Sequence, residues 1–111
     1  ILHEISRIRS LPPNAVMSAT VQSESMSNLI RKGDTIIMKK IPFSAIRRGD
    51  IVAFSLPNFP LPMVHRVAET SRWNTKKLLL TKGDASVGYD AWRVEETHYL
   101  GKVIEVKRGT D

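Results

Sequence analysis

Residues that could together cleave a peptide bond lie at separate points along this chain. Ser25 lies in the first quarter of the sequence, His65 lies near its middle, and Asp84 and Asp90 lie in a later segment. A serine hydroxyl is a weak nucleophile at neutral pH unless a base takes its proton, and a third group usually orients that base. Taken singly, a serine after a strand is more often a turn residue, and a lone strand histidine more often a packing residue. These residue types therefore predict hydrolysis only if the fold brings them together.

A histidine suits the role of the base. An imidazole has an ordinary pKa of about 6.5, so it is largely neutral at pH 7 and can accept a serine proton. A lysine would need deep burial to do the same. A carboxylate bonded to the other ring nitrogen would fix the tautomer and favour the imidazolium formed during attack. Asp84 and Asp90 are the candidates for this carboxylate.

The elements that must position these residues are mainly strands. From Ala15 onward, short runs rich in Val, Ile, Thr and Phe are separated by Gly-Asp, Pro or Asn signals, a pattern typical of strands and turns. We expect strands near residues 15–23, 35–40, 50–55, 63–70, 77–82 and 99–107. The predicted fold is mainly β, a small barrel or sandwich of coiled strands.

Turn and loop signals lie between these strands. Gly33-Asp34, Gly49-Asp50 and Gly83-Asp84 predict turns, because glycine can adopt a positive φ and aspartate can bond its local backbone. The proline-rich segment 57–62 predicts an exposed loop between two strands.

The first residues follow a different pattern. Ile1, Ile5 and Ile8 recur at helical spacing, and Pro12-Pro13 end the pattern. We therefore expect a short N-terminal helix and linker over residues 1–14, followed by a single β-rich domain over residues 15–111.

Length and composition fit one globular domain with a basic surface. The chain has 111 residues, 41% of them apolar and 25% charged, with a formal net charge of +6. The basic residues form scattered pairs without the interleaved aromatic residues that stack on bases, so no specific nucleic-acid binding is expected. An anionic membrane surface would explain the same charge.

Several classes of protein are disfavoured. There is no cysteine, which excludes a disulfide framework and a thiolate metal site, and His3, His65 and His98 are too widely separated to suggest a metal site. No cofactor is expected. The longest apolar runs, such as residues 51–54, are far shorter than the ~20 residues of a membrane span. The chain begins with Ile1, so we expect an upstream portion that could include an anchor.

Six blocks along the chain together resemble a known family. They are Ser23-Glu24-Ser25-Met26, Arg31-Lys32-Gly33-Asp34, Arg48-Gly49-Asp50-Ile51-Val52-Ala53-Phe54, Val64-His65-Arg66-Val67, Leu80-Thr81-Lys82-Gly83-Asp84 and Leu100-Gly101-Lys102-Val103. In this order they resemble the type I signal peptidase family (S26), and in particular the branch of the endoplasmic reticulum, archaea and some Gram-positive bacteria that uses histidine instead of lysine as the base. The resemblance spans about residues 17 to 106.

The resemblance implies a role for each matching residue. Ser25 would be the nucleophile and His65 the base, and the hydroxyl of Ser23 would help the Ser25 backbone N–H to stabilise the oxyanion. Asp90 would orient His65, and Asp84 would have a supporting or structural role. The fold would be of the kind shared with signal peptidases and LexA-like domains.

The resemblance also implies a substrate and a location. The substrate would be an extended peptide or precursor protein, paired as a strand beside the segment before Ser25 and cleaved after small residues. The location would be membrane-associated or extracytoplasmic. Met26 and Leu29 would line substrate pockets, contact lipid or simply pack in the core. The chain departs from the family at Ser27-Asn28, where a proline is usual, and in lacking the usual N-terminal membrane segment.

Two alternatives remain open. One is a self-cleaving domain of the LexA kind, which uses a lysine base where this chain has His65. The other is a non-catalytic basic β domain that binds nucleic acid, lipid or protein, with Ser25 and His65 as structural residues.

Overall fold

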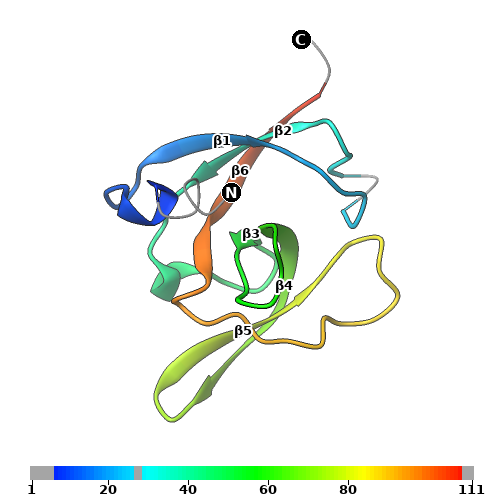
Figure 1. Ribbon diagram of the computed structural model, residues 1–111. Coiled ribbons are helices and arrows are strands. Elements are labelled where there is room, and N and C mark those ends of the chain that lie inside the picture. Colours follow the sequence, from blue (N-terminus) through cyan, green and yellow to red (C-terminus); the bar gives the residue numbers. More distant parts are fainter. Residues whose placement is uncertain (1–6, 27–28, 109–111) are drawn as a thin grey trace.

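The chain folds into one coiled antiparallel sheet. A computed structural model describes residues 7–26 and 29–108 (Figure 1). The strands are β1 (Val16–Thr20), β2 (Thr35–Lys39), β3 (Ile51–Phe54), β4 (Met63–Trp73), β5 (Lys76–Lys82) and β6 (Tyr99–Lys107), and a 3-10 helix, η1 (Phe43–Ala45), precedes β3. They lie in the order β1-β2-β6-β3-β4-β5. The predicted mainly β fold is confirmed.

Most of the predicted strands agree with the observed ones to within one or two residues. The exceptions are β1, which ends at Thr20 rather than at residue 23, and β4, which continues to Trp73. Beyond Thr20 the chain leaves β2 and turns toward residues 23–26. The longer β4 forms a hairpin with β5, which projects from the body of the molecule (Figure 1).

The sheet coils because three of its ladders contain register shifts. These irregularities lie at Ile37/Met38, Ala53/Phe54 and Val67/Glu69. A bulge adds a residue to one strand, which bends that strand and increases its twist. Strands β1, β2 and β6 therefore lie across one side of β3, and β4 and β5 lie across the other (Figure 1).

Two apolar cores result, and β3 lies between them. Ala53 packs in the core formed with β2 and β6, whereas Val52 and Phe54 pack in the core formed with η1, β4 and β5. Successive side chains of a strand point to opposite faces, so a strand buried on both faces can serve two cores. This central position explains the continuous apolar run of β3, 51–54.

Two turns share one geometry. Gly33 and Gly49 both have a φ of +94°, and the aspartate after each accepts a hydrogen bond from the backbone N–H of the arginine three residues before it, Arg31 (2.8 Å) or Arg47 (2.9 Å). The prediction of positive-φ turns is confirmed at these two glycines. The predicted turn at Gly83-Asp84 also forms, closed by a hydrogen bond from the Ser86 N–H to the Gly83 carbonyl (2.9 Å), but Gly83 does not adopt a positive φ.

The predicted N-terminal helix is described only in part. Residues 7–10 form a helical turn, and residues 1–6 of the prediction lie outside the described residues. The Lys40 ammonium donates hydrogen bonds to the carbonyls of Arg9 (2.7 Å) and Leu11 (2.5 Å) and so ties this turn to the sheet. Among the helices of the described residues, none has the length and apolar character needed to cross a membrane.

The positive φ of Gly49 gives a test of the turn. We expect Gly49→Ala to lower the free energy of unfolding by about 1–2 kcal/mol, because a Cβ is strained in this region. A Cβ would meet no atom within 4 Å at Gly49 or at Gly88, so Gly88→Ala is a matched control without the backbone strain. Urea unfolding followed by circular dichroism would measure both. Equal destabilisation by the two substitutions would contradict the strain argument.

Candidate active site

Ser25 lies between two anchored residues. Upstream, the Val21 N–H donates to the Asp34 carbonyl (2.8 Å) and the Gly33 N–H donates to the Val21 carbonyl (2.9 Å). Downstream, Met26 is 2% exposed and packs in the core beside β2 and β6. Ser25 itself is half-buried, and its hydroxyl lies 3.3 Å from the hydroxyl of Ser23. The two serines therefore form a small polar pair on a fixed segment.

His65 is held inside the fold by β4. It pairs with Val52 of β3 and is 6% exposed. Phe54 meets the imidazole edge-on, with ring centroids 6.0 Å apart, and Trp92 stacks on it at 6.3 Å with an interplanar angle of 24°. These aromatic contacts limit rotation of the imidazole.

A carboxylate fixes the orientation of this imidazole. Asp90 Oδ2 lies 2.5 Å from His65 Nδ1 and accepts a 2.7 Å hydrogen bond from the buried Thr81 hydroxyl. The Asp90 backbone N–H donates to the Thr81 carbonyl (2.9 Å), so Thr81 holds both the main chain and the side chain of Asp90. With Nδ1 directed at a carboxylate, Nε2 is left as the nitrogen that can exchange a proton with another group.

Gly83 lies where the serine segment and the histidine meet. A Cβ built on it would lie 2.6 Å from the Ser25 carbonyl oxygen and 3.2 Å from His65 Nε2. The next residues bind the serine segment, since the Ala85 N–H donates to the Ser25 carbonyl (2.9 Å) and the Asp84 N–H donates to Met26 Sδ (3.1 Å). Glycine is required here because there is no room for a side chain, not because of its φ.

The structure brings Ser23, Ser25, His65 and Asp90 into one cluster. Ser25 and the Nε2 face of His65 flank the same glycine, although in the described residues the Ser25 hydroxyl contacts Ser23 rather than the imidazole. Catalytic hydrogen bonds are often long before substrate binds. A hydroxyl, an imidazole and a carboxylate in this order are the parts of a serine nucleophile, its base and the group that orients the base.

Asp84 faces a different partner. Its carboxylate accepts two hydrogen bonds from the Arg66 guanidinium, 3.0 and 2.9 Å, and Arg66 also donates to the Gly49 carbonyl (2.9 Å). The hydrogen bond from Arg66 lowers the pKa of Asp84 below its ordinary value, against the opposing effect of burial. The same pair raises the pKa of Arg66. Asp84 therefore remains ionised and fixes the loop beside the site.

Two residues of the cluster were not singled out from the sequence. Thr81 alternates with Leu79 on the inward face of β5, so its pattern is that of a core residue. Trp92 bridges the imidazole to the loop between β3 and β4, because its ring also lies 5.2 Å from that of Phe59. The only sequence signal that could have placed Trp92 near the site is its position two residues after Asp90.

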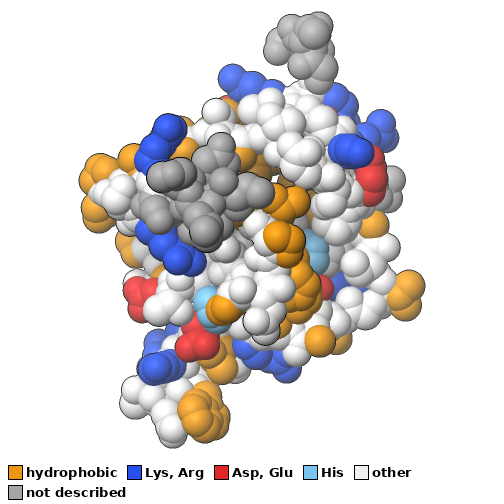
Figure 2. Space-filling view, viewed as in Figure 1, with side chains coloured by type: hydrophobic (Ala, Val, Ile, Leu, Met, Phe, Trp, Pro, Cys, Tyr) orange, Lys and Arg blue, Asp and Glu red, His pale blue; other side chains and the backbone are white. Residues whose placement is uncertain are grey.

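An exposed apolar loop adjoins the cluster, because Phe59 contacts Trp92, which stacks on His65. Phe59 and Leu61 are 42% and 43% exposed, which confirms the predicted exposed loop over 57–62. Hydrophobic side chains gather over this loop in the middle of the face shown in Figure 2. Met26 is a core residue and Leu29 is 43% exposed, so of the two only Leu29 presents substantial surface.

Comparisons with known proteins show that this chain is related to peptidases of the type I signal peptidase kind. Residues 4–104 match the family described as Peptidase S24-like, and the chain belongs to that family. The relationship expected from the six sequence blocks is thereby confirmed.

Individual relatives agree with this class. The chain is 35% identical over 81 residues to the signal peptidase complex catalytic subunit sec11 of Schizosaccharomyces pombe, a match that covers 58% of this chain and 43% of that protein. It is 38% identical over 64 residues to SEC11 of Candida tropicalis (58% and 38%) and 31% identical over 107 residues to SEC11 of Schizophyllum commune (75% and 55%). The chain thus spans about half or less of the length of these relatives.

The close approach at Gly83 can be tested directly. We expect Gly83→Ala to separate the two loops, because the new Cβ would overlap a backbone oxygen rather than a flexible side chain. The hydrogen bond from Ala85 to Ser25 would open, and exchange of the Ala85 amide hydrogen would accelerate about tenfold or more. Hydrogen exchange followed by NMR would measure this. Gly88→Ala is the control in the same loop, and an unchanged Ala85 amide in Gly83→Ala would contradict the packing argument.

The Asp84–Arg66 pair predicts a dependence of stability on pH. Because the pKa of Asp84 is lowered in the fold, its ionised form stabilises the protein above its ordinary value of 3.8, and this contribution is lost as the pH falls through the lowered value. The unfolding free energy of wild type should therefore exceed that of Asp84→Asn at pH 7, and the gap should shrink as the pH falls below 3.8. Glu69→Gln, an exposed position on β4, is the control. A gap that is constant with pH would refute the assignment.

Proposed function

We propose that this chain is the catalytic domain of a serine endopeptidase that cleaves extended peptides after small residues. Ser25 is the nucleophile, His65 the general base, and Asp90 the carboxylate that orients the base. The observation that carries the proposal is the 2.5 Å contact of His65 Nδ1 with Asp90, with Nε2 directed at the glycine that also contacts Ser25.

The proposed reaction follows from these positions. Rotation of the Ser25 side chain away from Ser23 would bring its hydroxyl to His65 Nε2, which takes the proton as the oxygen attacks the peptide carbonyl. The imidazolium then gives this proton to the leaving amine as the carbon–nitrogen bond breaks. A water molecule, activated by the same imidazole, hydrolyses the resulting ester and restores Ser25.

The charge that develops on the carbonyl oxygen needs hydrogen-bond donors. The Ser25 backbone N–H and the Ser23 hydroxyl are the proposed donors, since Ser23 already lies within 3.3 Å of the Ser25 hydroxyl. Asp84 supports the site from outside the reaction, because it holds the 83–85 loop through Arg66.

The substrate is proposed to bind as an added strand. β1 pairs with β2 on one side and stands at the end of the strand order, and the chain that leaves β1 leads to Ser23 and Ser25. An extended peptide could therefore use backbone hydrogen bonds to the free edge of β1 and present alternate side chains to the site. The relatives are named as signal peptidase complex catalytic subunits, which supports a precursor protein as the substrate and a membrane surface as the place of action.

Substitution of the proposed catalytic residues tests this function. Ser25→Ala and His65→Ala should each lower turnover of an extended peptide library by about 10³-fold or more, and Asp90→Asn by no more than these. Mass spectrometry of the products would give both the rate and the residues before the cleaved bond. Ser71→Ala, on β4, and His98→Ala, in the turn before β6, are the matched controls and should retain the wild-type rate.

Three outcomes would count against the proposal. Cleavage at the wild-type rate by His65→Ala would show that His65 is not the base. The self-cleaving alternative would be favoured if the protein cleaves its own chain at a rate that does not depend on protein concentration and does not cleave added peptide. Full biological activity of Ser25→Ala would favour a non-catalytic binding domain.

A further inference from the structure

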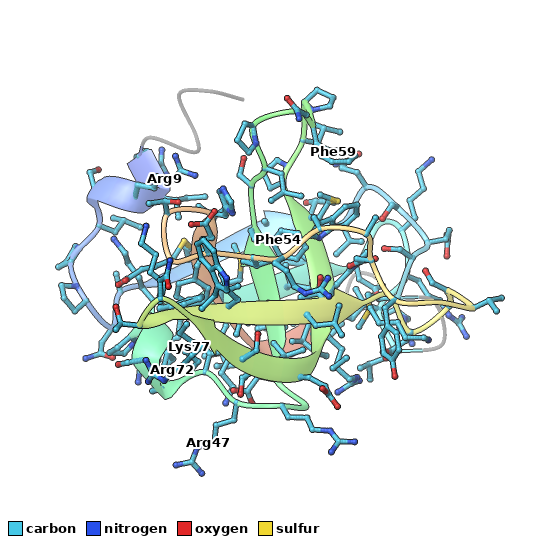
Figure 3. The ribbon with its side chains drawn as sticks, turned by 90° about the horizontal axis from the view of Figure 1, so that it is seen from below. Arg9, Arg47, Phe54, Phe59, Arg72 and Lys77 are labelled. Carbon is cyan, nitrogen blue, oxygen red and sulfur yellow. The ribbon has the colours of Figure 1, made fainter. Side chains whose placement is uncertain are left out.

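A second region of interest lies away from the candidate active site. A hollow of about 380 Å³ lies between the segment that follows η1 and the outer part of the β4–β5 hairpin. The residues that line it are Ser44, Ile46, Arg47, Arg48, Thr70, Ser71, Arg72 and Lys77. Figure 3 places Arg47, Arg72 and Lys77 at the end of the molecule opposite the loop that follows β5, and on the side opposite Phe59.

The lining is unusual in its charge. It combines four cationic side chains with three hydroxyl groups, and none of the described residues that line it carries a carboxylate. Asp50, the aspartate of the turn that contains Arg47, is already used: it accepts a hydrogen bond from the Arg47 backbone N–H (2.9 Å) and pairs with Lys102 (3.3 Å). Within the described chain, Arg47, Arg48 and Arg72 form no salt bridge, although Glu95 and Glu96 line an adjoining hollow together with Arg72 and Lys77.

The floor of the hollow is rigid. The Lys77 ammonium donates hydrogen bonds to three carbonyl oxygens at the end of η1, those of Phe43 (3.1 Å), Ser44 (3.1 Å) and Ile46 (2.5 Å). It also lies 5.7 Å from the centre of the Phe43 ring. Lys77 therefore ties η1 to β5 and supplies positive charge beneath the arginines while its own donors are occupied.

These cations repel one another. Burial is the main cause of the lowered pKa of Lys77, and Arg72 and Arg47 lower it further. The arginines above it are exposed and can direct several N–H donors at one group. An anion in the hollow would relieve the repulsion, and a tetrahedral oxyanion could also accept hydrogen bonds from the hydroxyls at the rim.

We propose that this hollow binds a phosphate group, through Arg47 and Arg72 with Arg48 and the rim hydroxyls in support. Guanidinium groups bind phosphate oxygens in a bidentate geometry, which favours phosphate over a spherical anion such as chloride. The phosphate could be free or could belong to the headgroup of an anionic lipid. The site is independent of the proposed peptidase function, since it shares no residue with it.

Titration with inorganic phosphate at low and constant ionic strength tests the site. NMR should show saturable shifts of the amides of residues 44–48 and 70–77, and the melting temperature should rise with phosphate but not with sodium chloride of equal ionic strength. The double variant Arg47→Gln, Arg72→Gln should bind phosphate about tenfold more weakly or worse. Arg9→Gln with Lys107→Gln removes the same charge from exposed positions that do not line the hollow, one in the N-terminal helical turn and one at the end of β6, and should bind like wild type.

A second arm distinguishes the source of the phosphate. Vesicles of phosphatidylcholine with and without phosphatidic acid are sedimented with each protein. Capture would assign a lipid headgroup if it requires phosphatidic acid, is competed away by free phosphate, and is lost in the Arg47/Arg72 double variant. Binding of phosphate without capture by vesicles would assign the free ion. Equal weakening in both double variants, or an equal rise in melting temperature with chloride, would overturn the proposal.

Discussion

The contact between the 23–26 segment and the 83–85 loop is the constraint on which the candidate site depends. The two segments are almost sixty residues apart in sequence, and they meet through one hydrogen bond to the Ser25 carbonyl, one contact with the sulfur of Met26, and the missing side chain of Gly83. Each segment has its own anchor: Met26 is buried in one core, and the Asp84 carboxylate is held by Arg66 of β4. A serine and a histidine from different parts of the sheet can therefore share a fixed neighbour.

The two-sided burial of β3 explains why this contact forms beside an ordered imidazole. Val52 of β3 pairs with His65 of β4, and Phe54 of β3 packs against the same imidazole from within the second core. The Asp90 carboxylate that contacts the imidazole lies on the loop after β5, and Thr81 of β5 holds it in place. The histidine is thus positioned by apolar packing on its faces and by a polar contact at one nitrogen, and the second nitrogen faces Gly83. Such a division leaves little freedom in the ring and one atom available for proton transfer.

The sequence predicts the strands better than it predicts the site. Short runs rich in Val, Ile, Thr and Phe, bounded by signals such as the Gly-Asp turns at Gly33 and Gly49, locate the six strands, because both signals depend on local geometry. Gly83 carries the same signal for a different reason, since its requirement is space and only the folded structure supplies the neighbours. The roles of Asp84 and Asp90 could be proposed from resemblance alone, whereas their different partners depend on where the loop runs. Thr81 has the pattern of a core residue, so its contact with Asp90 could not be foreseen.

The basic residues are a second case in which the sequence alone does not show which side chains meet in the fold. Along the sequence the basic residues form scattered pairs, which argues against an extended surface for nucleic acid. Folding leaves most of them scattered but brings Arg47 and Arg48 to the same hollow as Arg72 and Lys77. The turn that holds Asp50 explains why this charge persists: the aspartate is drawn inward to bond the Arg47 backbone and Lys102, while the arginine side chains stay outside. In the matching turn at Gly33, Asp34 pairs with Arg108, so its carboxylate is likewise used to hold the fold. Each carboxylate bonds its own turn and pairs with a cation elsewhere in the chain, so neither forms a salt bridge with the arginine that begins its turn. In the Gly49 turn this leaves the Arg47 guanidinium free at the hollow that is proposed to bind phosphate.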